Sequence, residues 1–185
     1  MANKTMVELQ AEIISLFPDN TIGSITPAQL RQFCSDFVTS MTPAYGALQI
    51  NTTKVQTFNI TPAVTMVWDV ELVATPPQYT TDAATGAINR VDGVCTNQIT
   101  FNVDVGLANG RVIFATLYKN GVATPFRATA TGRGAGNPTI LSFDAIDYSN
   151  VPATYQVFCT TDADTTPVTF TNGVFIARLL PVNTA

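Results

Sequence analysis

The sequence of 185 residues contains no histidine. The chain therefore cannot build the histidine-based catalytic triads, metal sites or pH switches that many enzymes and sensors use. This absence argues against the commonest hydrolases. Charge is also scarce, because Asp, Glu, Lys and Arg make up 12% of the residues, about half of the roughly 25% usual in soluble domains. So few charges suit a protein that packs against neighbouring proteins.

Basic clusters and long apolar runs are missing as well. The net charge is −4, and the nine basic residues are scattered from Lys4 to Arg178, so we expect no nucleic-acid partner. No apolar run approaches the ~20 residues that a membrane-spanning helix needs. Glu8 and Glu12 interrupt the apolar N-terminal stretch, which argues against a secretory signal peptide. We therefore expect the chain to fold in a cytoplasm and to have no membrane partner.

The three cysteines, Cys34, Cys95 and Cys159, are widely spaced, odd in number and without a CxxC motif. This pattern favours a reducing compartment and buried free thiols. A disulfide between Cys95 and Cys159 is the alternative if their strands adjoin. None of the three has a histidine to activate it as a nucleophile.

Two helical patterns open the chain. Apolar residues recur at helical spacing over residues 6–17, and Pro18 ends that helix. In the second pattern Thr26 is an N-cap, Pro27 occupies the first helical position and Gln29 completes a capping box. This helix is expected to end near Ser40 or Met41, before Thr42-Pro43. Its apolar stripe consists of Leu30, Phe33, Cys34, Phe37, Val38 and Met41.

Two short amphipathic helices cannot bury their apolar stripes alone. One interpretation is a hairpin that docks on its own β domain, and the other is an anchor or oligomerisation segment. We favour the second because the segment precedes the domain as a separate unit and its Phe and Met residues suit an interface. The predicted organisation is a helical anchor or oligomerisation segment over residues 1–44 and a β-sandwich domain over residues 45–185.

From about Tyr45 the pattern changes to the two-residue period of β-strands. Apolar residues alternate along 64–72 and 95–105, whereas residues 111–118 are apolar on both faces. Asn120-Gly121 is a hairpin turn signal, with a return strand over 123–131. Further strands are expected at 55–61, 139–144, 154–160 and 168–180. With Gly, Pro and Asn between them, these strands predict a mostly β, antiparallel, jelly-roll-like sandwich.

The acidic pairs and the glycine-rich loop do not predict a catalytic or ligand-binding site. Asp69 and Glu71 are two residues apart, so on a strand they point to the same face. A glycosidase could use such a pair, but the simpler interpretation is that they form the solvent-exposed face of the strand. Asp144 with Asp147 and Asp162 with Asp164 resemble parts of calcium loops without the full motif. The loop 132–136 lacks the ending of a phosphate-binding loop. We expect no catalytic residue, no cofactor and no metal ligand, with a weak divalent-ion site as the alternative.

The remaining candidate residues are those that could contact another protein. The apolar stripe of the second helix has large side chains, and both faces of the strand 111–118 need to be covered by other parts of the protein or by a partner. An arginine at the tip of the glycine-rich loop could contact a receptor or a neighbouring subunit. The candidate interface residues are Leu30, Phe33, Phe37, Met41, Phe114, Tyr118 and Arg133.

Several segments together resemble a known class of protein. Residues 16–20, followed by the capped helix from Ile25 and by Thr42-Pro43, are similar to N-terminal segments of tailed-bacteriophage virion proteins. The run from Arg111 to Gly121 and the terminal strand 172–179 resemble jelly rolls of the tumour-necrosis-factor and complement globular-head type. Those domains commonly form trimers. No catalytic or binding residue carries over from the resemblance.

The resemblance implies a non-enzymatic virion structural protein, a trimeric capsid decoration or head-fibre protein that docks on the phage shell. Its partners would be its own copies and the major capsid protein or other virion proteins. It would be made in the host cytoplasm and reside in the virion. The alternative is a tail-fibre module that binds a host surface glycan or protein through loops 75–85 and 131–138. A depolymerase that uses Asp69 or Glu71 is a third, weaker hypothesis.

Overall fold

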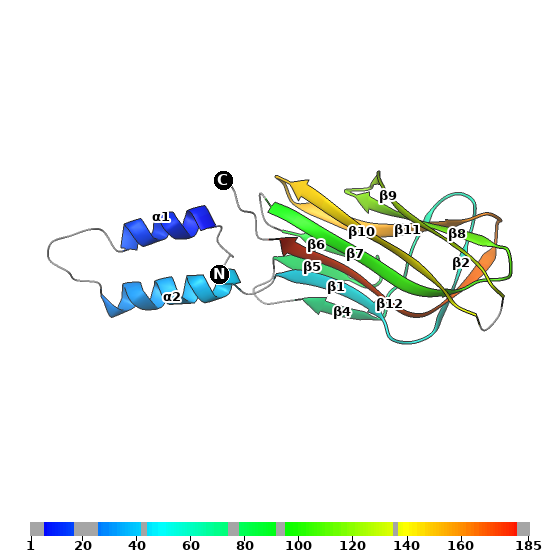
Figure 1. The fold of residues 1–185 in the computed structure, drawn as a ribbon, viewed down its shortest axis with the longest axis horizontal. Coiled ribbons are helices and arrows are strands. Elements are labelled where there is room, and N and C mark those ends of the chain that lie inside the picture. The colour runs from blue at the N-terminus through cyan, green and yellow to red at the C-terminus, as the bar shows by residue number, and fades with distance from the viewer. Residues whose placement is uncertain are drawn as a thin grey trace.

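Two antiparallel β-sheets packed face to face form most of the molecule, with two helices beyond one end (Figure 1). The computed structural model describes residues 6–16, 26–41, 44–73, 78–91, 95–134 and 137–180. The predicted fold class, a mostly β antiparallel sandwich preceded by two short helices, is confirmed.

The helices are α1 (Met6–Leu16) and α2 (Pro27–Met41), which lie beside each other (Figure 1). The predicted capping box is present. The Thr26 backbone N–H donates to Gln29 Oε1 at 2.9 Å, and the Gln29 N–H donates to Thr26 Oγ1 at 3.2 Å, which starts α2 at Pro27. Phe17 and Pro18, expected at the end of the first helix, lie outside the described residues. Among the helices that are described, none has the length and apolarity to cross a membrane.

The strands divide into two six-stranded sheets. Sheet A contains, in spatial order, β10 (Thr139–Ser149), β7 (Cys95–Gly106), β12 (Thr166–Leu180), β1 (Tyr45–Ile50) and β4 (Val70–Val73), with β2 (Lys54–Phe58) also paired to β12. Sheet B contains β5 (Tyr79–Asp82), β6 (Ala87–Arg90), β11 (Ala153–Thr161), β8 (Val112–Lys119) and β9 (Val122–Thr131), with β3 (Val64–Thr65) paired to β11.

Most strands begin and end close to the predicted positions, but the single strand expected over 64–72 is wrong. The chain crosses there from sheet B to sheet A, and β3 and β4 are its two ends. Between them the Met66 N–H donates to the Val157 carbonyl and the Trp68 N–H to the Ala83 carbonyl. These bonds to two different partners replace a continuous ladder. Strands β1, β5 and β6 had not been assigned from the sequence, because they are short and lack a clear alternation.

The core between the sheets is built around an aromatic cluster. The ring centroid of Phe101 lies 5.0 Å from that of Phe143, and the ring centroid of Trp68 lies 5.9 Å from that of Phe175. In β7 the predicted alternation is confirmed, because Ile99, Phe101, Val103 and Val105 are all fully buried. Such stacked contacts add to the free energy gained by burying the rings.

Gly46 lies where β1 of sheet A approaches sheet B most closely. A Cβ atom at this position would lie 2.9 Å from Ile88 Cγ2 and 2.9 Å from Tyr79 Cβ. Both neighbours are fully buried, so neither can move away without disturbing the core. The glycine therefore sets the spacing between the sheets at this point.

We expect Gly46→Ala to lower the free energy of unfolding by about 1–3 kcal/mol, because it overpacks the core. Urea denaturation of the full chain measures this change. Gly106→Ala is the matched control, since its Cβ would lie 3.4 Å from the nearest atom, Thr169 Cβ. An equal loss in both variants would show that the close approach at Gly46 has no special cost.

Candidate interaction surfaces

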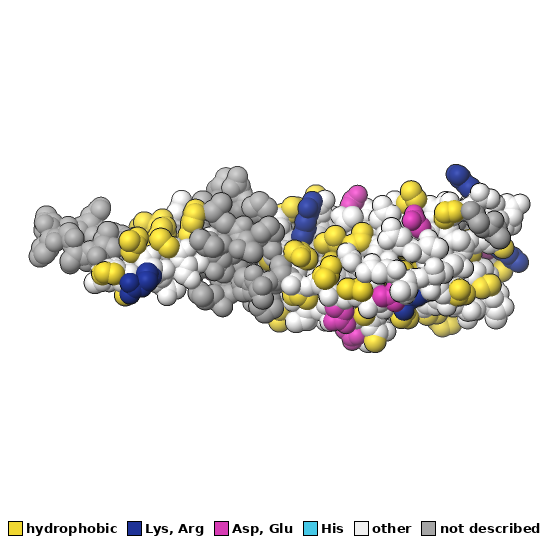
Figure 2. Space-filling model, turned by 90° about the horizontal axis from the view of Figure 1, so that it is seen from below, with side chains coloured by type: hydrophobic (Ala, Val, Ile, Leu, Met, Phe, Trp, Pro, Cys, Tyr) yellow, Lys and Arg dark blue, Asp and Glu magenta, His cyan; other side chains and the backbone are white. Residues whose placement is uncertain are grey.

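The helix candidates lie together on α2. Leu30 and Phe37 are 51% and 44% exposed, and Phe33 is half-buried with its ring centroid 6.1 Å from that of Phe37. On α1, Ile14 is 73% exposed. Figure 2 shows hydrophobic side chains on the visible face of the helical end of the molecule. The helical pair thus presents apolar side chains to solvent. The side chain of the remaining candidate on this helix, Met41, lies outside the described part.

The other candidates lie elsewhere, so the seven residues do not form one site. Phe114, 38% exposed, and Tyr118 point away from the core on sheet B, where the Tyr118 ring centroid lies 4.3 Å from that of Phe158. Arg133 is exposed in the loop after β9, at the end of the sandwich away from the helices (Figure 1). Strand β8 pairs with β11 on one edge and with β9 on the other, while Phe114 on its outward face stays exposed.

The sequence analysis missed the outward face of sheet A, the side of that sheet turned away from the core. On its central strand β12, Val174 and Ile176 point outward and are only half-buried. Ile140, Ile146 and Tyr148 on β10 are 60%, 63% and 63% exposed. In Figure 1 this face looks toward the viewer, and no described helix or strand crosses it. The signal was present in residues 174–177, which are apolar on both faces.

Asp69 and Glu71 bind backbone groups of two different loops and do not line a common cleft. The Oδ2 atom of Asp69 accepts hydrogen bonds from the Asn51 and Thr52 backbone N–H groups, and Lys54 Nζ lies 2.5 Å from Oδ1. Lys54 and these donors hold the pKa of the Asp69 carboxyl well below its usual range. Glu71 Oε1 instead accepts from the Ala83 N–H at 2.7 Å. The two carboxylates therefore order separate segments.

The two further acidic pairs are engaged by neighbouring groups of the chain. Asp144 accepts a hydrogen bond from Thr100 Oγ1 at 2.7 Å, and Asp164 accepts one from the Ile60 N–H at 2.9 Å. Arg111 forms a weak ion pair with Asp162 at 4.0 Å. Within the described ranges there is no group of three His, Cys, Asp or Glu residues that could hold a metal ion.

Polar side chains link the two sheets at the end near the helices. Tyr155 of sheet B donates to Asp147 Oδ2 of sheet A at 2.7 Å, and Lys119 Nζ lies 2.8 Å from the same atom. Tyr79 of sheet B donates to Asn97 Oδ1 of sheet A at 2.6 Å. Burial raises the pKa of both tyrosine hydroxyls, so they remain protonated donors. These hydrogen bonds and the ion pair hold the two sheets together at this end.

All three cysteines are free. The alternative of a disulfide is wrong, because Cys95 lies in sheet A and Cys159 in sheet B with no bond between them. Burial raises the pKa of the Cys95 thiol although Arg90, whose Nη1 donates to Cys95 Sγ at 2.6 Å, lowers it. Burial also raises the pKa of Cys159. The expectation of a buried thiol is wrong for Cys34, which is exposed because nothing in the described chain covers that face of α2.

Comparison with known proteins finds likeness in structure alone. No family model matches the sequence, and no curated protein matches it. The Eiger TNF of S. frugiperda superposes with a TM-score of 0.51 at 9% identity, over 77% of this chain and 96% of that one. Murine APRIL gives 0.53 at 8% identity, over 74% of this chain and 99% of that one. The globular domain of zebrafish complement 1qA protein gives 0.52 at 9%, over 76% and 98%.

The β-sandwich has the jelly-roll fold of these domains. That part of the resemblance inferred from the sequence is confirmed. At 8–9% identity the likeness extends to the fold and no further. The three neighbours are covered almost whole, whereas about a quarter of this chain has no counterpart in them.

We expect Tyr155→Phe to lower the free energy of unfolding by about 1.5–3 kcal/mol, because it removes a hydrogen bond to the Asp147 carboxylate between the sheets. Tyr118→Phe is the matched control, since Tyr118 lies on the outward face of sheet B and no described group hydrogen-bonds its hydroxyl, so the change should stay within about 0.5 kcal/mol. Denaturant unfolding of both variants measures the difference. Equal stabilities would contradict a stabilising role for this inter-sheet contact.

Proposed function

We propose that this chain is a non-enzymatic structural protein that assembles with its own copies, as a trimer, through the outward face of sheet A. The observation that carries the proposal is the apolar centre of that face. Val174 and Ile176 of β12 lie in register with Gln49 and Ala47 of β1, and Leu72 follows on β4. No described element covers them, and exposed apolar faces of this kind mark protein interfaces.

The face is large enough for a stable interface. Strand β7 has 12 residues, so at ~3.4 Å per residue and ~4.8 Å between strands the five-stranded face covers roughly 900 Å². A standard interface buries about 800 Å² per partner. The fold likeness to jelly-roll domains, which commonly form trimers, supports assembly with its own copies, and the low charge content of the chain agrees with such assembly.

The helical pair is proposed as an anchor on a phage shell. Residues 1–44 would form the anchor segment and residues 45–185 the assembling domain. Helices of 11 and 15 residues are marginal in water unless their apolar sides are covered, and Leu30, Phe37 and Ile14 are exposed. The proposed partner is the major capsid protein or another virion protein. The chain would be made in the host cytoplasm and reside in the virion, as its N-terminal resemblance to phage proteins implies.

A non-enzymatic role agrees with what the candidate acids do. Asp69 is engaged by Lys54 and by two backbone donors, and Glu71 by the Ala83 N–H. The two carboxylates are thus bound by separate segments, and the chain has no histidine. Assembly through buried apolar surface needs no reacting group.

A tail-fibre role is the second candidate, supported by the exposed Arg133 at the end of the sandwich away from the helices. Such an end is free to meet a receptor when the helices hold the other end. The candidate loop 75–85 is less suitable, because it contains strand β5 and the fully buried Tyr79. The loop 131–138 remains the better candidate for receptor binding.

We expect Ile176→Lys to convert the trimer into monomers, because it places charge at the centre of the proposed interface. Light scattering of the full chain measures the mass, and circular dichroism confirms that the sheets persist. Phe114→Lys is the control on the outward face of sheet B, where Phe114 is 38% exposed, and it should remain trimeric. Dissociation of the control alone would move the interface to sheet B, and a monomeric parent chain would refute the proposal.

Copy number separates the two virion roles. A decoration protein is present in a large number of copies per particle, whereas a tail-tip protein is present in few. Quantitative mass spectrometry of purified particles of the phage that encodes the chain measures this number. We expect a large number, comparable with that of the shell protein. A count of a few copies favours the tail-fibre role, and absence from the particles contradicts both.

A further inference from the structure

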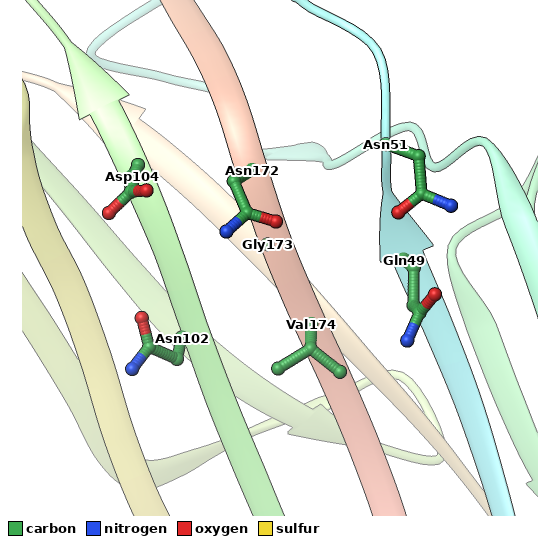
Figure 3. Close-up of a pocket in the computed structure, with 7 residues that line it drawn as sticks. All are labelled: Gln49, Asn51, Asn102, Asp104, Asn172, Gly173 and Val174. Carbon is green, nitrogen blue, oxygen red and sulfur yellow. The ribbon is translucent and has the colours of Figure 1, made fainter.

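A polar hollow of about 290 Å³ interrupts the apolar part of the outward face of sheet A (Figure 3). Four of its lining side chains are carboxamides, and Asp104 is its single charged group. Val174 is the one apolar side chain among them. The lining residues are Gln49, Asn51, Asn102, Asp104, Asn172, Gly173 and Val174.

Strand register brings these carboxamides together. On β12, Asn172 lies opposite Asp104 of β7, and Val174 lies between Asn102 of β7 and Gln49 of β1. The register shift between Phe170 and Asn172 changes which residues of β12 face the core. Before it Phe170 points inward, and after it Phe175 does. The irregularity thus leaves Asn172 on the outward face, beside the other amides (Figure 3).

The carboxamides of the hollow have no hydrogen-bond partner among the side chains that the structure describes. Among the described residues, no side chain bonds to the amide groups of Gln49, Asn102 or Asn172, and all three are exposed or half-buried. Asn51 is engaged only through its backbone N–H, which donates to Asp69. In the monomer, water satisfies these groups. If this face is covered, they need partners, because a buried amide without one costs about 1–3 kcal/mol.

We propose that Gln49, Asn102 and Asn172 form a carboxamide layer between copies of this chain that fixes how the copies align and how many assemble. The inference rests on the proposed assembly through sheet A. An amide both donates and accepts hydrogen bonds, so it can pair with the identical residue of another copy. The carboxylate of Asp104 only accepts and would repel its own copy, so its matching group is an amide N–H of another copy, such as that of Asn172. A second copy, which carries both kinds of group, is therefore the occupant whose chemistry matches this hollow.

The layer acts by penalising misaligned assemblies. Sliding one copy by two residues along a strand, about 7 Å, would place amides against Val174 or Ile176 and leave their hydrogen bonds unmade. The apolar surroundings alone would tolerate such a shift, because hydrophobic contact is not directional. A single polar residue in an otherwise apolar helical interface is known to set register and copy number at a cost in stability.

The test uses Gln49→Met and Asn102→Leu in the full chain, with native mass spectrometry as the readout. We expect the parent chain to show one oligomeric mass. Each variant should instead show a mixture of oligomeric masses, without a fall in the midpoint temperature of thermal unfolding. Ser142→Leu is the matched control: Ser142 is exposed on the same face, opposite Asn102 in β10, and does not line the hollow. It should keep the single mass.

Each outcome separates this inference from the assembly on which it rests. If the parent chain forms one oligomer and both variants keep that mass alone, the carboxamide layer is wrong and the interface stands. If the variants become monomers, the amides supply affinity rather than alignment, which also overturns the inference. If Ser142→Leu scatters the mass equally, the effect is not specific to the hollow. A monomeric parent chain refutes the assembly itself.

Discussion

The position of β12 between β7 and β1 is the constraint on which the rest of the structure depends. This strand of 15 residues pairs with three others. Its inward side chains, Phe170 and Phe175 among them, build the core, and its outward side chains occupy the middle of the exposed face of sheet A. Because side chains alternate along a strand, one register error in β12 would exchange core and surface. The irregularity after Phe170 is tolerated because Gly173 follows it, where a Cβ would lie 2.3 Å from Val103 Cγ1.

Local signals in the sequence were sufficient for the elements that depend on local chemistry. The cap at Thr26 is a contact between residues three apart, and the turn at Asn120-Gly121 needs only the positive φ angles that both residues adopt. The alternation in 95–105 also predicted β7 correctly. These features need no knowledge of the partner strand, and the mostly β sandwich follows from their number and spacing.

The sequence-based predictions fail where the structure of a segment depends on which other segment it pairs with. The segment 64–72 alternates like a strand, but Met66 and Trp68 belong to the crossing between sheets, and only the positions of Val157 and Ala83 determine this. In the same way Phe114 and Val174 lie on opposite outer faces of the molecule, although both sit in strands apolar on two sides. The sequence indicates that such strands need cover. It does not indicate whether their two sides meet another sheet, solvent or a second chain.

The scarcity of charge acquires a physical reason once the outer face of sheet A is considered as a symmetric contact. In such a contact every side chain near the axis meets its own copy. A charged residue at the axis opposes an identical charge, whereas Asn, Gln and Thr can pair with their own copies. Asp104, which lines the hollow, therefore needs a donor from a different residue of the other copy. Arg178 follows the same logic at the helix end of this face, where its Nε donates to Gln98 Oε1 at 2.9 Å within the chain. This hydrogen bond is thus made within one copy and does not join two copies.

The helices and the sheet face can act together because both follow the long axis of the molecule (Figure 1). Copies joined side by side through sheet A would all present their helices at the same end. A single pair of short helices has little stability of its own. Held beside the pairs of sister chains, it gains contacts at high effective concentration, and a shell then meets several anchors at once rather than one. Assembly of the sandwich would therefore strengthen docking without any change in the docking residues themselves.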